Sequence, residues 1–518
     1  MKGSKRSLLA AWCAACGLWS PSAAANYRAA TSAALADLTD RLAPGDTLTV
    51  APGRYDVTSW TLSGLAGKPD KWIVIRGEPG AAIRSASGCC NLVQIDNSSY
   101  LALQGLELGM AKDNPDIDGI NVGGKYSHHL RFENLKISGM TGNGISVFAD
   151  SASFLELLRS EIGPVTGCGL YWGYPGTHLV HDALIQGNYI HHCPSDASDP
   201  LNYGIQFKGW GYRARILDNV LHDVGGTTRS ALIAYYGRKP LAGDRPEDAN
   251  IVSGNILWNC RNEGITVMSD AVVENNIVFS AVVGINLQTY GDESFDGTSA
   301  VENLAVRNNT VFRCEEACIA LSGWTGAGAG VSLTGNAAIQ GSATAVAISG
   351  SPGTARVAGN AAFGKSSLAG TQIARGLADW VSASAGATVP ELDFYPSASS
   401  SLKDIVDSQD CATTDFNGTA RPIGGKCDAG AYEAGAGANP GWRPQAGFKG
   451  GAGSTAIRGK RPKSKRSGSV PLFKDGKRVW IPGGVSENFP VDASGKTLIP
   501  GPGNGTERAA RRAAAEAP

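Results

Sequence analysis

Short runs in which apolar residues alternate with other residues recur along most of the chain, separated by glycine and asparagine. In one recurring phrase an asparagine is flanked by aliphatic residues on both sides. The asparagines of this phrase are Asn134, Asn188, Asn219, Asn255, Asn276, Asn309, Asn336 and Asn360. Their spacing runs from 21 residues (Asn255 to Asn276) to 54 (Asn134 to Asn188), and Ser160 stands at the expected place inside the widest gap. No helical period lies between them, so the pattern predicts strands and turns.

A second phrase, a small residue followed by alternating aliphatic residues, falls between consecutive asparagines. Examples are DGINV at 118–122, NGISV at 143–147, CGLYW at 168–172, YGIQF at 203–207 and SALIAY at 230–235. Repeats of this length, made only of strands and turns, predict an all-β solenoid of about ten coils in which each coil buries its aliphatic residues against the next. An asparagine at a fixed turn tolerates left-handed backbone and can bond the equivalent asparagine one coil away.

Composition and charge narrow the classes of protein. Glycine makes up 68 of the 518 residues, and charged residues only 18%, which argues against a coiled coil or a large helical bundle. No run of 18 apolar residues occurs, so we expect no membrane-spanning segment. The 46 basic and 46 acidic residues balance only in sum, because residues 26–448 hold 29 bases against 41 acids, a net of −12.

The two ends of the chain differ from its body. Residues 1–25 combine Lys2, Lys5 and Arg6 with a short apolar stretch and Ala23-Ala24-Ala25, which predicts a signal peptide and a secreted or periplasmic protein. In an exported chain the cysteines can form disulfides, and Cys411–Cys427 is the pair we expect. Residues 436–518 are rich in Gly, Ala, Pro, Lys and Arg, which predicts a mostly disordered basic tail with at most a hairpin near VPLF and RVWIP.

The body of the chain, residues 26–435, resembles the right-handed parallel β-helix proteins, especially secreted bacterial polysaccharide lyases. The segments LAPGDTLTVAPGRYDV at 42–57 and KWIVIRGEPGAAI at 71–83 are similar to the first coils of alginate and chondroitin lyases. The segment DFNGTARPIGGKCDAGAYE at 415–433 is similar to the closing motif of many secreted β-helix proteins. The resemblance implies a right-handed parallel β-helix with its active site on the outer face of the strands that follow the small residue.

Alternation predicts which residues point outward from those strands. The first outward row is Asn121, Ser146, Tyr171, Gln206, Ile233, Thr266 and Asn286, and the second, two positions later, is Phe148, Gly173, Lys208, Tyr235, Met268 and Gln288. The longest loops, at 193–202 and 237–249, fall beside the same coils. Aromatic side chains that suit sugar rings, among them Tyr171 and Trp210, are concentrated there.

Lys208 is the sharpest catalytic candidate. It is the only basic residue in the two outward rows, and a lysine with a lowered pKa can take the proton next to a uronate carboxyl group in β-elimination. Arg238 is the predicted partner that neutralises this carboxyl group, and Tyr235 or Tyr236 is a competing acid or base. Gln206, Tyr171, Trp210, Arg229 and His222 are the predicted substrate-binding residues.

Calcium is the cofactor that the sequence suggests, since Asp116 and Asp118 precede one of the strands and carboxylates suit Ca²⁺. The competing interpretation is that these aspartates cap turns. The function predicted is a secreted lyase, active as a monomer on an acidic polysaccharide and with no nucleic-acid partner. A glycoside hydrolase or epimerase on the same scaffold, or a non-enzymatic carbohydrate-binding β-helix, remains the alternative.

Overall fold

The structure is a computed structural model of the chain. It describes residues 24–86, 91–110, 117–173, 179–194, 202–208, 211–225, 230–235, 249–268, 270–288, 301–322, 330–383, 389, 391–435, 439–449, 469–474 and 477–482. The chain forms two units, Met1–Gly453 and Ser454–Pro518. The predicted signal peptide lies almost entirely outside the described residues.

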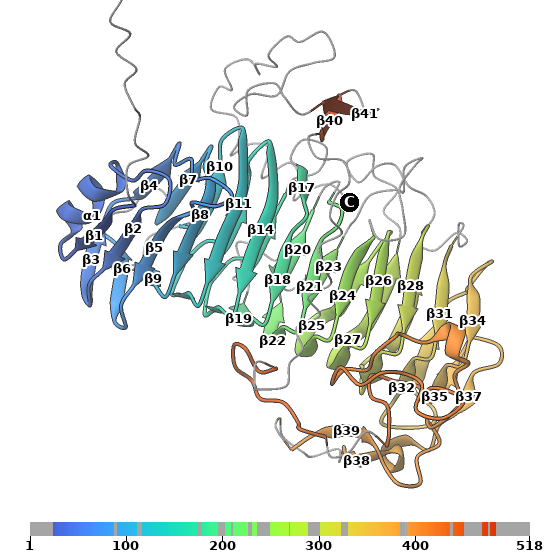
Figure 1. Ribbon diagram of the computed structural model, residues 1–518. Helices are drawn as coiled ribbons and strands as arrows, with labels where there is room; N and C mark the ends of the chain where they lie inside the picture. Colours follow the sequence, from blue (N-terminus) through green and yellow to red (C-terminus); the bar gives the residue numbers. More distant parts are fainter. Residues whose placement is uncertain are drawn as a thin grey trace, which may run out of the picture. The chain divides into compact units, whose positions relative to one another are not determined.

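Three faces of parallel strands run along the first unit (Figure 1), and consecutive strands of each coil contribute to each face in turn. Face A is the 14-stranded sheet of β1 (Asn26–Ala29), β2 (Thr47–Val50), β5 (Ile73–Gly77), β8 (Ser99–Gln104), β11 (Tyr126–Glu133), β14 (Ser151–Leu158), β17 (Leu179–His181), β18 (Leu184–Gln186), β21 (Arg215–Leu217), β24 (Asn250–Ser253), β26 (Ala271–Glu274), β28 (Leu304–Arg307), β31 (Ser332–Thr334) and β34 (Arg356–Ala358).

Faces B and C are the two parts of a 23-stranded sheet. Face B consists of β3 (Gly53–Val57), β6 (Ala81–Ser85), β9 (Glu107–Met110), β12 (Lys136–Ser138), β15 (Glu161–Ile162), β19 (Tyr189–Pro194), β22 (Val220–Gly225), the first halves of β25 (Ile256–Val267) and β27 (Ile277–Gln288), β29 (Thr310–Phe312), β32 (Ala337–Ile339), β35 (Ala361–Phe363) and β37 (Gln372–Ile373). Face C consists of β4 (Trp60–Ser63), β7 (Val93–Asp96), β10 (Ile120–Gly123), β13 (Ile145–Val147), β16 (Leu170–Trp172), β20 (Asn202–Phe207), β23 (Ser230–Tyr235), the second halves of β25 and β27, β30 (Ala317–Ser322), β33 (Val346–Ser349) and β36 (Lys365–Ser366).

The core is built from rows of aliphatic residues stacked in register along each face. On face C the inward row includes Ile120, Ile145, Leu170, Ile205, Ile233, Ile265 and Ile285, all fully buried. Burial of each such side chain stabilises the fold by about 1.5–3 kcal/mol. The spacing of aliphatic residues in the sequence is therefore the spacing of the coils that stack in the core. The predicted right-handed parallel β-helix is confirmed.

The described solenoid has more coils than the ten or so expected. Of the 14 strands of face A, β17 lies beside the main path, which leaves thirteen successive coils. The sequence underestimates the number because the first coils lack the asparagine phrase. In those coils Gly105 makes the left-handed turn (φ 64°), followed by the buried Leu106 rather than an asparagine.

A ladder of buried asparagines stabilises the turn between faces A and B. Each side-chain amide donates to the next asparagine's Oδ1 at 2.9–3.0 Å, from Asn188 through Asn219, Asn255, Asn276, Asn309 and Asn336 to Asn360. Ser160 joins the ladder through its backbone N–H, 2.9 Å from Asn188 Oδ1. The predicted bonding between coils is therefore confirmed.

Two details of the ladder prediction are wrong. Asn134 is exposed, and the buried Leu135 occupies the ladder position of its coil, with its N–H donating to Ser160 Oγ at 3.0 Å. The left-handed residue is also not the ladder asparagine but its predecessor, as in Asn134 (φ 53°), Asp218 (φ 53°) and Asn275 (φ 56°). The tight turn needs one residue with positive φ and one with a buried amide, and these are neighbours in the chain.

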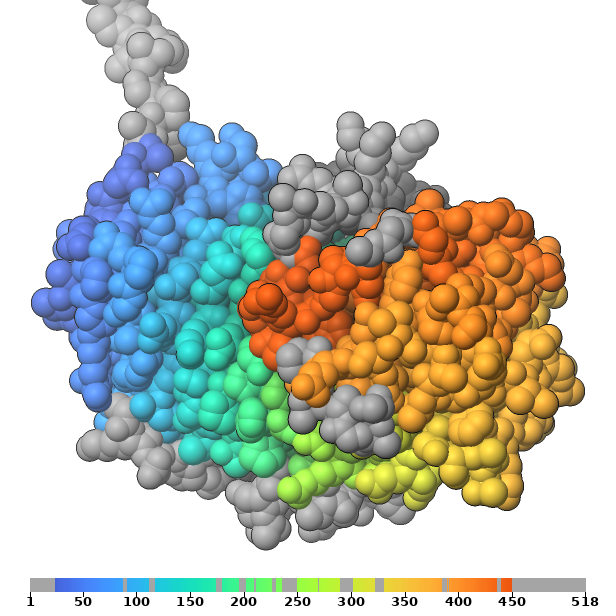
Figure 2. Space-filling model, turned by 90° about the horizontal axis from the view of Figure 1, so that it is seen from below, coloured from blue at the N-terminus to red at the C-terminus, as the bar shows by residue number. Residues whose placement is uncertain are grey.

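The C-terminal segment of the first unit folds back over the later coils of face B, shown in orange in Figure 2. This segment contains 3₁₀ turns at Gly376–Asp379 (η3) and Ser408–Asp410 (η4), and strands β38 (Trp380–Ser382) and β39 (Asp393–Pro396). Phe394 and Trp380 pack on Phe312, and Trp442 packs on Trp258. The packing continues to Lys449, whose Nζ lies 2.7 Å from Asp218 Oδ1. Trp442 and Lys449, which follow residue 435, thus belong to the packing of this unit. The predicted domain boundaries, at residues 25 and 435, stay a prediction.

The closing motif, residues 415–433, contains a network of hydrogen bonds and one half of the predicted disulfide. Cys411 and Cys427 are bonded, as expected, whereas Cys193, Cys260, Cys314 and Cys318 are buried and reduced. The guanidinium of Arg421, whose side chain is fully buried, donates to the carbonyl oxygens of Asp428 and Gly430 at 2.8 Å and pairs with Glu433 at 3.4 Å. These contacts give the motif a structural role.

The described elements near the two ends of the chain differ in kind, with a helix near the start and a hairpin near the end. Helix α1 (Ser32–Thr39) contacts the first strands, with Leu35 in the core and Thr31 Oγ1 accepting the N–H of Ala34 at 3.1 Å. The second unit contains the predicted hairpin, β40 (Ser469–Lys474) paired antiparallel with β41 (Lys477–Pro482). In the described residues, no helix has the length and apolar character needed to cross a bilayer.

Candidate functional site

The outer surface of face C carries the predicted row of polar residues. Register places Asn121, Ser146, Tyr171, Gln206, Ala234, Thr266 and Asn286 in line on consecutive coils. Although they point away from the core, most are shielded from solvent, and Gln206 is only 3% exposed. Met268 is buried in a small cluster with Tyr203 and Ala234 on the same surface. This face is therefore a partly desolvated environment, in which charged groups interact more strongly than in water.

The predicted outward phase is wrong in strand β23. Ile233 pairs with Ile205 and is fully buried, so Ala234 and not Ile233 belongs to the outward row. Tyr235 pairs with Phe207 and Val267, which are both buried in the core, so its register position belongs to the inward row. The phase shifts by one because Leu232 takes the place of the glycine that precedes the other strands, such as Gly204. The catalytic role of Tyr235 stays a prediction.

Lys208 and Tyr171 are brought together on adjacent coils. Lys208 directly follows β20, and its backbone N–H donates to Trp172 O at 2.8 Å, which continues the hydrogen bonding between β20 and β16. Its Nζ donates to Tyr171 OH at 3.0 Å and lies 4.8 Å from the centroid of the Tyr171 ring. Gln206 lies two residues earlier, paired in register with Tyr171. An amine and a phenol in direct hydrogen-bond contact form a pair that can take up and return a proton.

Several predicted site residues lie outside the described residues: Trp210, Arg229, Tyr236, Arg238 and Asp116. Their assignments stay predictions. Asp118 is described and almost fully buried, with Oδ1 accepting the backbone N–H of Asn143 at 2.6 Å and Oδ2 accepting Ser146 Oγ at 2.5 Å. A calcium ion at Asp118 would have to replace these bonds, and the calcium requirement likewise stays a prediction.

His222 lies in β22 of face B, and its described contacts form a separate cluster there. Its Nε2 is 2.7 Å from Tyr189 OH, and its Nδ1 is 2.6 Å from Asp223 Oδ2. Its ring stacks between His191, at 5.6 Å, and Trp258, at 4.3 Å between centroids. His191 Nδ1 is 2.8 Å from His192 Nδ1, and His192 Nε2 is 3.6 Å from Asp223 Oδ2. We name this group, Tyr189, His191, His192, His222 and Asp223, the histidine cluster.

Burial sets the protonation states in the histidine cluster. Desolvation, followed by the neighbouring His222 and His192, lowers the pKa of His191 to about 4, and desolvation also lowers the pKa of His222. Burial would raise the pKa of Asp223, but hydrogen bonds from His222 and Asn259 hold it below its usual value. Desolvation and the charge of Glu161 raise the pKa of Tyr189. Near neutral pH His191 and His222 are therefore neutral imidazoles beside the ionised carboxylate of Asp223.

The sequence contains a signal for the histidine cluster that the prediction did not use. His191, His222 and Trp258 each stand three residues after a ladder asparagine, and His192, Asp223 and Asn259 stand four residues after one. Aligning the repeats on Asn188, Asn219 and Asn255 would have stacked these side chains on consecutive coils.

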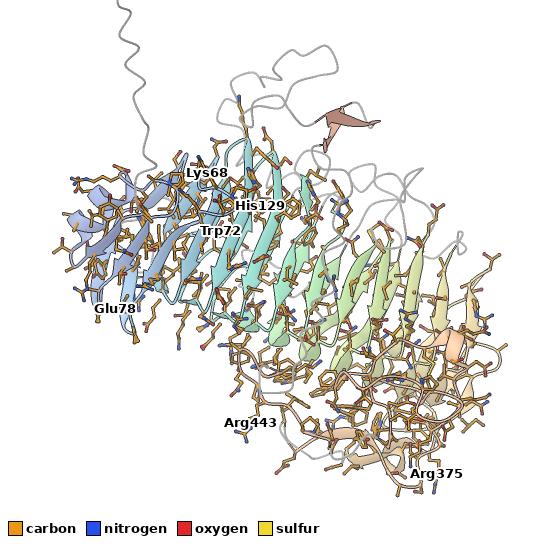
Figure 3. All side chains as sticks on the ribbon, in the orientation of Figure 1. Lys68, Trp72, Glu78, His129, Arg375 and Arg443 are labelled. Atoms are coloured by element: carbon orange, nitrogen blue, oxygen red, sulfur yellow. A yellow bond between two sulfur atoms is a disulfide. The ribbon has the colours of Figure 1, made fainter. Side chains whose placement is uncertain are left out.

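Face A carries a row of aromatic rings, in which Figure 3 shows Trp72 and His129 close together. His129 stacks between Tyr100 and Phe154, at 4.4 Å from each ring centroid. Because the rings of this row cover one another's faces, mainly their edges are available to a ligand. We assign the row a structural role.

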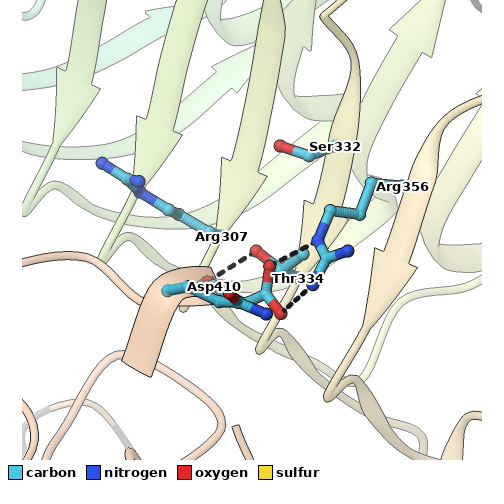
Figure 4. Close-up of a pocket in the computed structure, with 6 residues that line it drawn as sticks. Arg307, Ser332, Thr334, Arg356 and Asp410 are labelled. Atoms are coloured by element: carbon cyan, nitrogen blue, oxygen red, sulfur yellow. Dashed lines mark hydrogen bonds and ion pairs between the residues drawn. The ribbon is translucent and has the colours of Figure 1, made fainter. Parts of the chain in front are cut away.

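A pocket of about 280 Å³ lies at the far end of face A, lined by Arg307, Ser332, Thr334, Arg356, Gln409 and Asp410 (Figure 4). Arg356 forms a bidentate pair with Asp410 at 2.6 and 2.7 Å, and Arg307 pairs with Glu274 at 2.8 Å. Both guanidinium groups thus have counter-ions, and Thr334 Oγ1 donates to Asp410 O at 2.7 Å. The pocket marks the docking of η4 on the solenoid.

The fold of this chain is a right-handed parallel β-helix. The family described as "Right handed beta helix region" matches residues 118–300, which contain Lys208, Tyr171 and the histidine cluster.

Solved structures similar to this chain include polysaccharide-active proteins. The PL6 family alginate lyase AlyGC is 14% identical, with 67% of this chain and 53% of that chain covered and a TM-score of 0.44. The pectate lyase Pel9A is 13% identical, with coverages of 80% and 97% and a TM-score of 0.41. The A-module of the Azotobacter vinelandii mannuronan C-5 epimerase AlgE6 is 15% identical, with coverages of 64% and 94% and a TM-score of 0.37. Likeness at these identities concerns the fold alone. No curated protein sequence matches.

Proposed function

We propose that the protein is a secreted polysaccharide lyase that cleaves a uronate-containing polysaccharide by β-elimination on face C. The observation that carries the proposal is the contact of 3.0 Å between Lys208 Nζ and Tyr171 OH on the partly desolvated outer surface of that face. Lys208, as the free amine, takes the proton from the carbon next to the uronate carboxyl group. Tyr171 donates its proton to the glycosidic oxygen as the bond between that oxygen and the neighbouring ring carbon breaks, which leaves a carbon–carbon double bond in the product.

The reaction also needs a positive group at the uronate carboxylate, where negative charge develops in the transition state. Arg229 and Arg238 are the proposed candidates, and a bound Ca²⁺ is the other. Because residues 26–448 carry a net charge of −12, attraction of an acidic glycan must come from local bases. Lys208, Arg229, Arg238 and Lys239 are the bases proposed to supply it, whereas Arg213 pairs with Asp182 and Arg215 lies in β21 of face A.

The experiment is a depolymerisation assay of the purified chain on alginate, pectate, hyaluronan, chondroitin and heparin, followed by the ultraviolet absorbance of unsaturated uronates. Lys208→Ala and Tyr171→Phe should each lower kcat by about 10²–10⁴ on the active substrate. Lys365→Ala is the matched control, because Lys365 is an exposed lysine on the same face in β36, and it should retain the full rate. Silence on every substrate, or full activity of Lys208→Ala, would contradict the proposal, and saturated products would favour a hydrolase.

A further inference from the structure

The histidine cluster has the ligand set and the surroundings of a metal site. One atom each from His192, His222 and Asp223 lie within 4.8 Å of one another. Two imidazoles and one carboxylate are a ligand set of zinc and similar divalent transition metals, which leave a fourth position to water or substrate. Calcium and magnesium prefer sites built from oxygen ligands alone.

The distances between these atoms suit a small tetrahedral ion. Ligands about 2.0–2.1 Å from zinc lie about 3.3 Å from one another. His192 Nε2 and Asp223 Oδ2 are 3.6 Å apart, close to this value. His222 Nδ1 and Asp223 Oδ2 are 2.6 Å apart and share a hydrogen bond. A metal ion would take the place of that proton, and His222 Nδ1 and Asp223 Oδ2 would have to move apart by less than 1 Å.

Each of the three ligand residues has a second polar atom that is already held. His222 Nε2 contacts Tyr189 OH at 2.7 Å, and His192 Nδ1 contacts His191 Nδ1 at 2.8 Å. Asp223 Oδ1 accepts a hydrogen bond from Asn259 Nδ2. Partners of this kind fix the ring orientation and the tautomer of metal-bound histidines. Three polar side chains that met by chance would not need such partners on their second polar atoms.

The backbone holds the ligands on consecutive coils. His192 and Asp223 both have left-handed backbone (φ 51° and 54°), which an ordinary residue adopts at a cost. His191 and His222 pair in register between β19 and β22. The site is also accessible, because the side chain of His192 is 57% exposed whereas that of His222 is 8% exposed.

We propose that His192, His222 and Asp223 bind a divalent transition metal ion of the zinc class, with Tyr189, His191 and Asn259 as positioning residues. The site lies on face B and is independent of the proposed lyase reaction on face C. It lies beside Trp258, which stacks on His222 and contacts Trp442 of the C-terminal segment. The ion would therefore join two coils next to the point where that segment is attached.

The test uses the full chain without a histidine tag, stripped with a chelator and titrated with Zn²⁺ in equilibrium dialysis and with Co²⁺ in visible absorption spectroscopy. The wild type should bind one ion per chain, with the absorption of a tetrahedral cobalt site, and its thermal midpoint should rise on zinc addition. His192→Ala and Asp223→Ala should weaken binding at least tenfold, and Tyr189→Phe about 10-fold. Ca²⁺ and Mg²⁺ should not compete.

His128→Ala is the matched control, because His128 and His129 form a similar pair on face A, with 2.9 Å between their Nδ1 atoms. This variant should bind zinc as the wild type does. Because the His192 side chain is exposed, His192→Ala should fold normally, and it tests the site even if a change at the buried His222 disturbs folding. The proposal is overturned if the wild type binds no stoichiometric zinc, or if His192→Ala binds as tightly as His128→Ala.

Discussion

Replacing Asn255 with alanine removes one rung of the asparagine ladder. Its Oδ1 accepts the backbone N–H of Asn219 at 2.9 Å and the side-chain amide of Asn219 at 3.0 Å. Its own amide donates to Asn276 Oδ1 and to Ile216 O, both at 2.9 Å. The residue is fully buried, so water cannot take over these bonds without opening the turn.

The cost follows from what remains after the substitution. The Asn219 N–H loses its acceptor, and a buried donor without a partner costs about 1–3 kcal/mol. The side-chain bonds that are lost add about 0.5–1.5 kcal/mol each, whereas Asn276 Oδ1 still accepts the Asn255 N–H at 3.1 Å. We expect Asn255→Ala to lower the free energy of unfolding by about 3–5 kcal/mol.

Urea unfolding followed by circular dichroism measures this change, with the thermal midpoint as a second readout because solenoids can unfold in parts. Asn134→Gly is the control, since Asn134 is exposed, outside the ladder and in left-handed backbone that glycine adopts freely. It should change stability by no more than about 0.5 kcal/mol. Equal losses for the two variants would refute the reasoning that the ladder, and not asparagine as such, stabilises the turn.

Three further outcomes are expected. Arg421→Met should cost about 3–5 kcal/mol and lower the thermal midpoint, because it leaves the buried Glu433 without its cation, and an unchanged midpoint would show that the pair is dispensable. Reduction of Cys411–Cys427, which closes a 16-residue separation, should destabilise the chain by about 3 kcal/mol in urea unfolding, a result to be compared with Cys411→Ser. Burial would raise the pKa of Asp182, but hydrogen bonds from His181 and Arg213 hold it well below 3.8, so ionised Asp182 stabilises the fold above that pH and the contribution is lost as pH falls further. Asp182→Asn should therefore lower the midpoint near neutral pH and matter less below pH 3.8, and an equal effect at both would contradict this account.

The fold could be predicted because both the buried aliphatic residues and the hydrogen-bonding asparagines recur once per coil in the sequence. Stacked aliphatic rows impose the alternation, and the ladder requires an amide once per coil. The ladder prediction was wrong at Asn134 because a turn that needs left-handed backbone selects the same residue type as a ladder position. The phase of β23 was wrong because Leu232 stands where other strands have glycine, which alternation by itself does not reveal.

The candidate site was predictable only on face C. Lys208 and Tyr171 follow from the alternation within a coil and the stacking of coils, and their contact was therefore within reach of the sequence. The histidine cluster and its neighbours Trp258 and Asn259 emerge only when the repeats are aligned on Asn188, Asn219 and Asn255, which are 31 and 36 residues apart because their loops differ in length. The alternation within a single coil does not reveal this arrangement.

The return of the C-terminal segment over face B has a consequence for the order in which the protein folds. A solenoid can grow one coil at a time, since each coil needs only its neighbour. Here, however, the contact between Lys449 and Asp218 spans 231 residues, and that between Ala412 and Asn308 spans 104. Until the last part of the chain arrives, Trp258, Phe279 and Phe312 form an uncovered aromatic strip on finished coils. A chain truncated directly after β37 would keep its solenoid and display that strip, which makes it prone to aggregation.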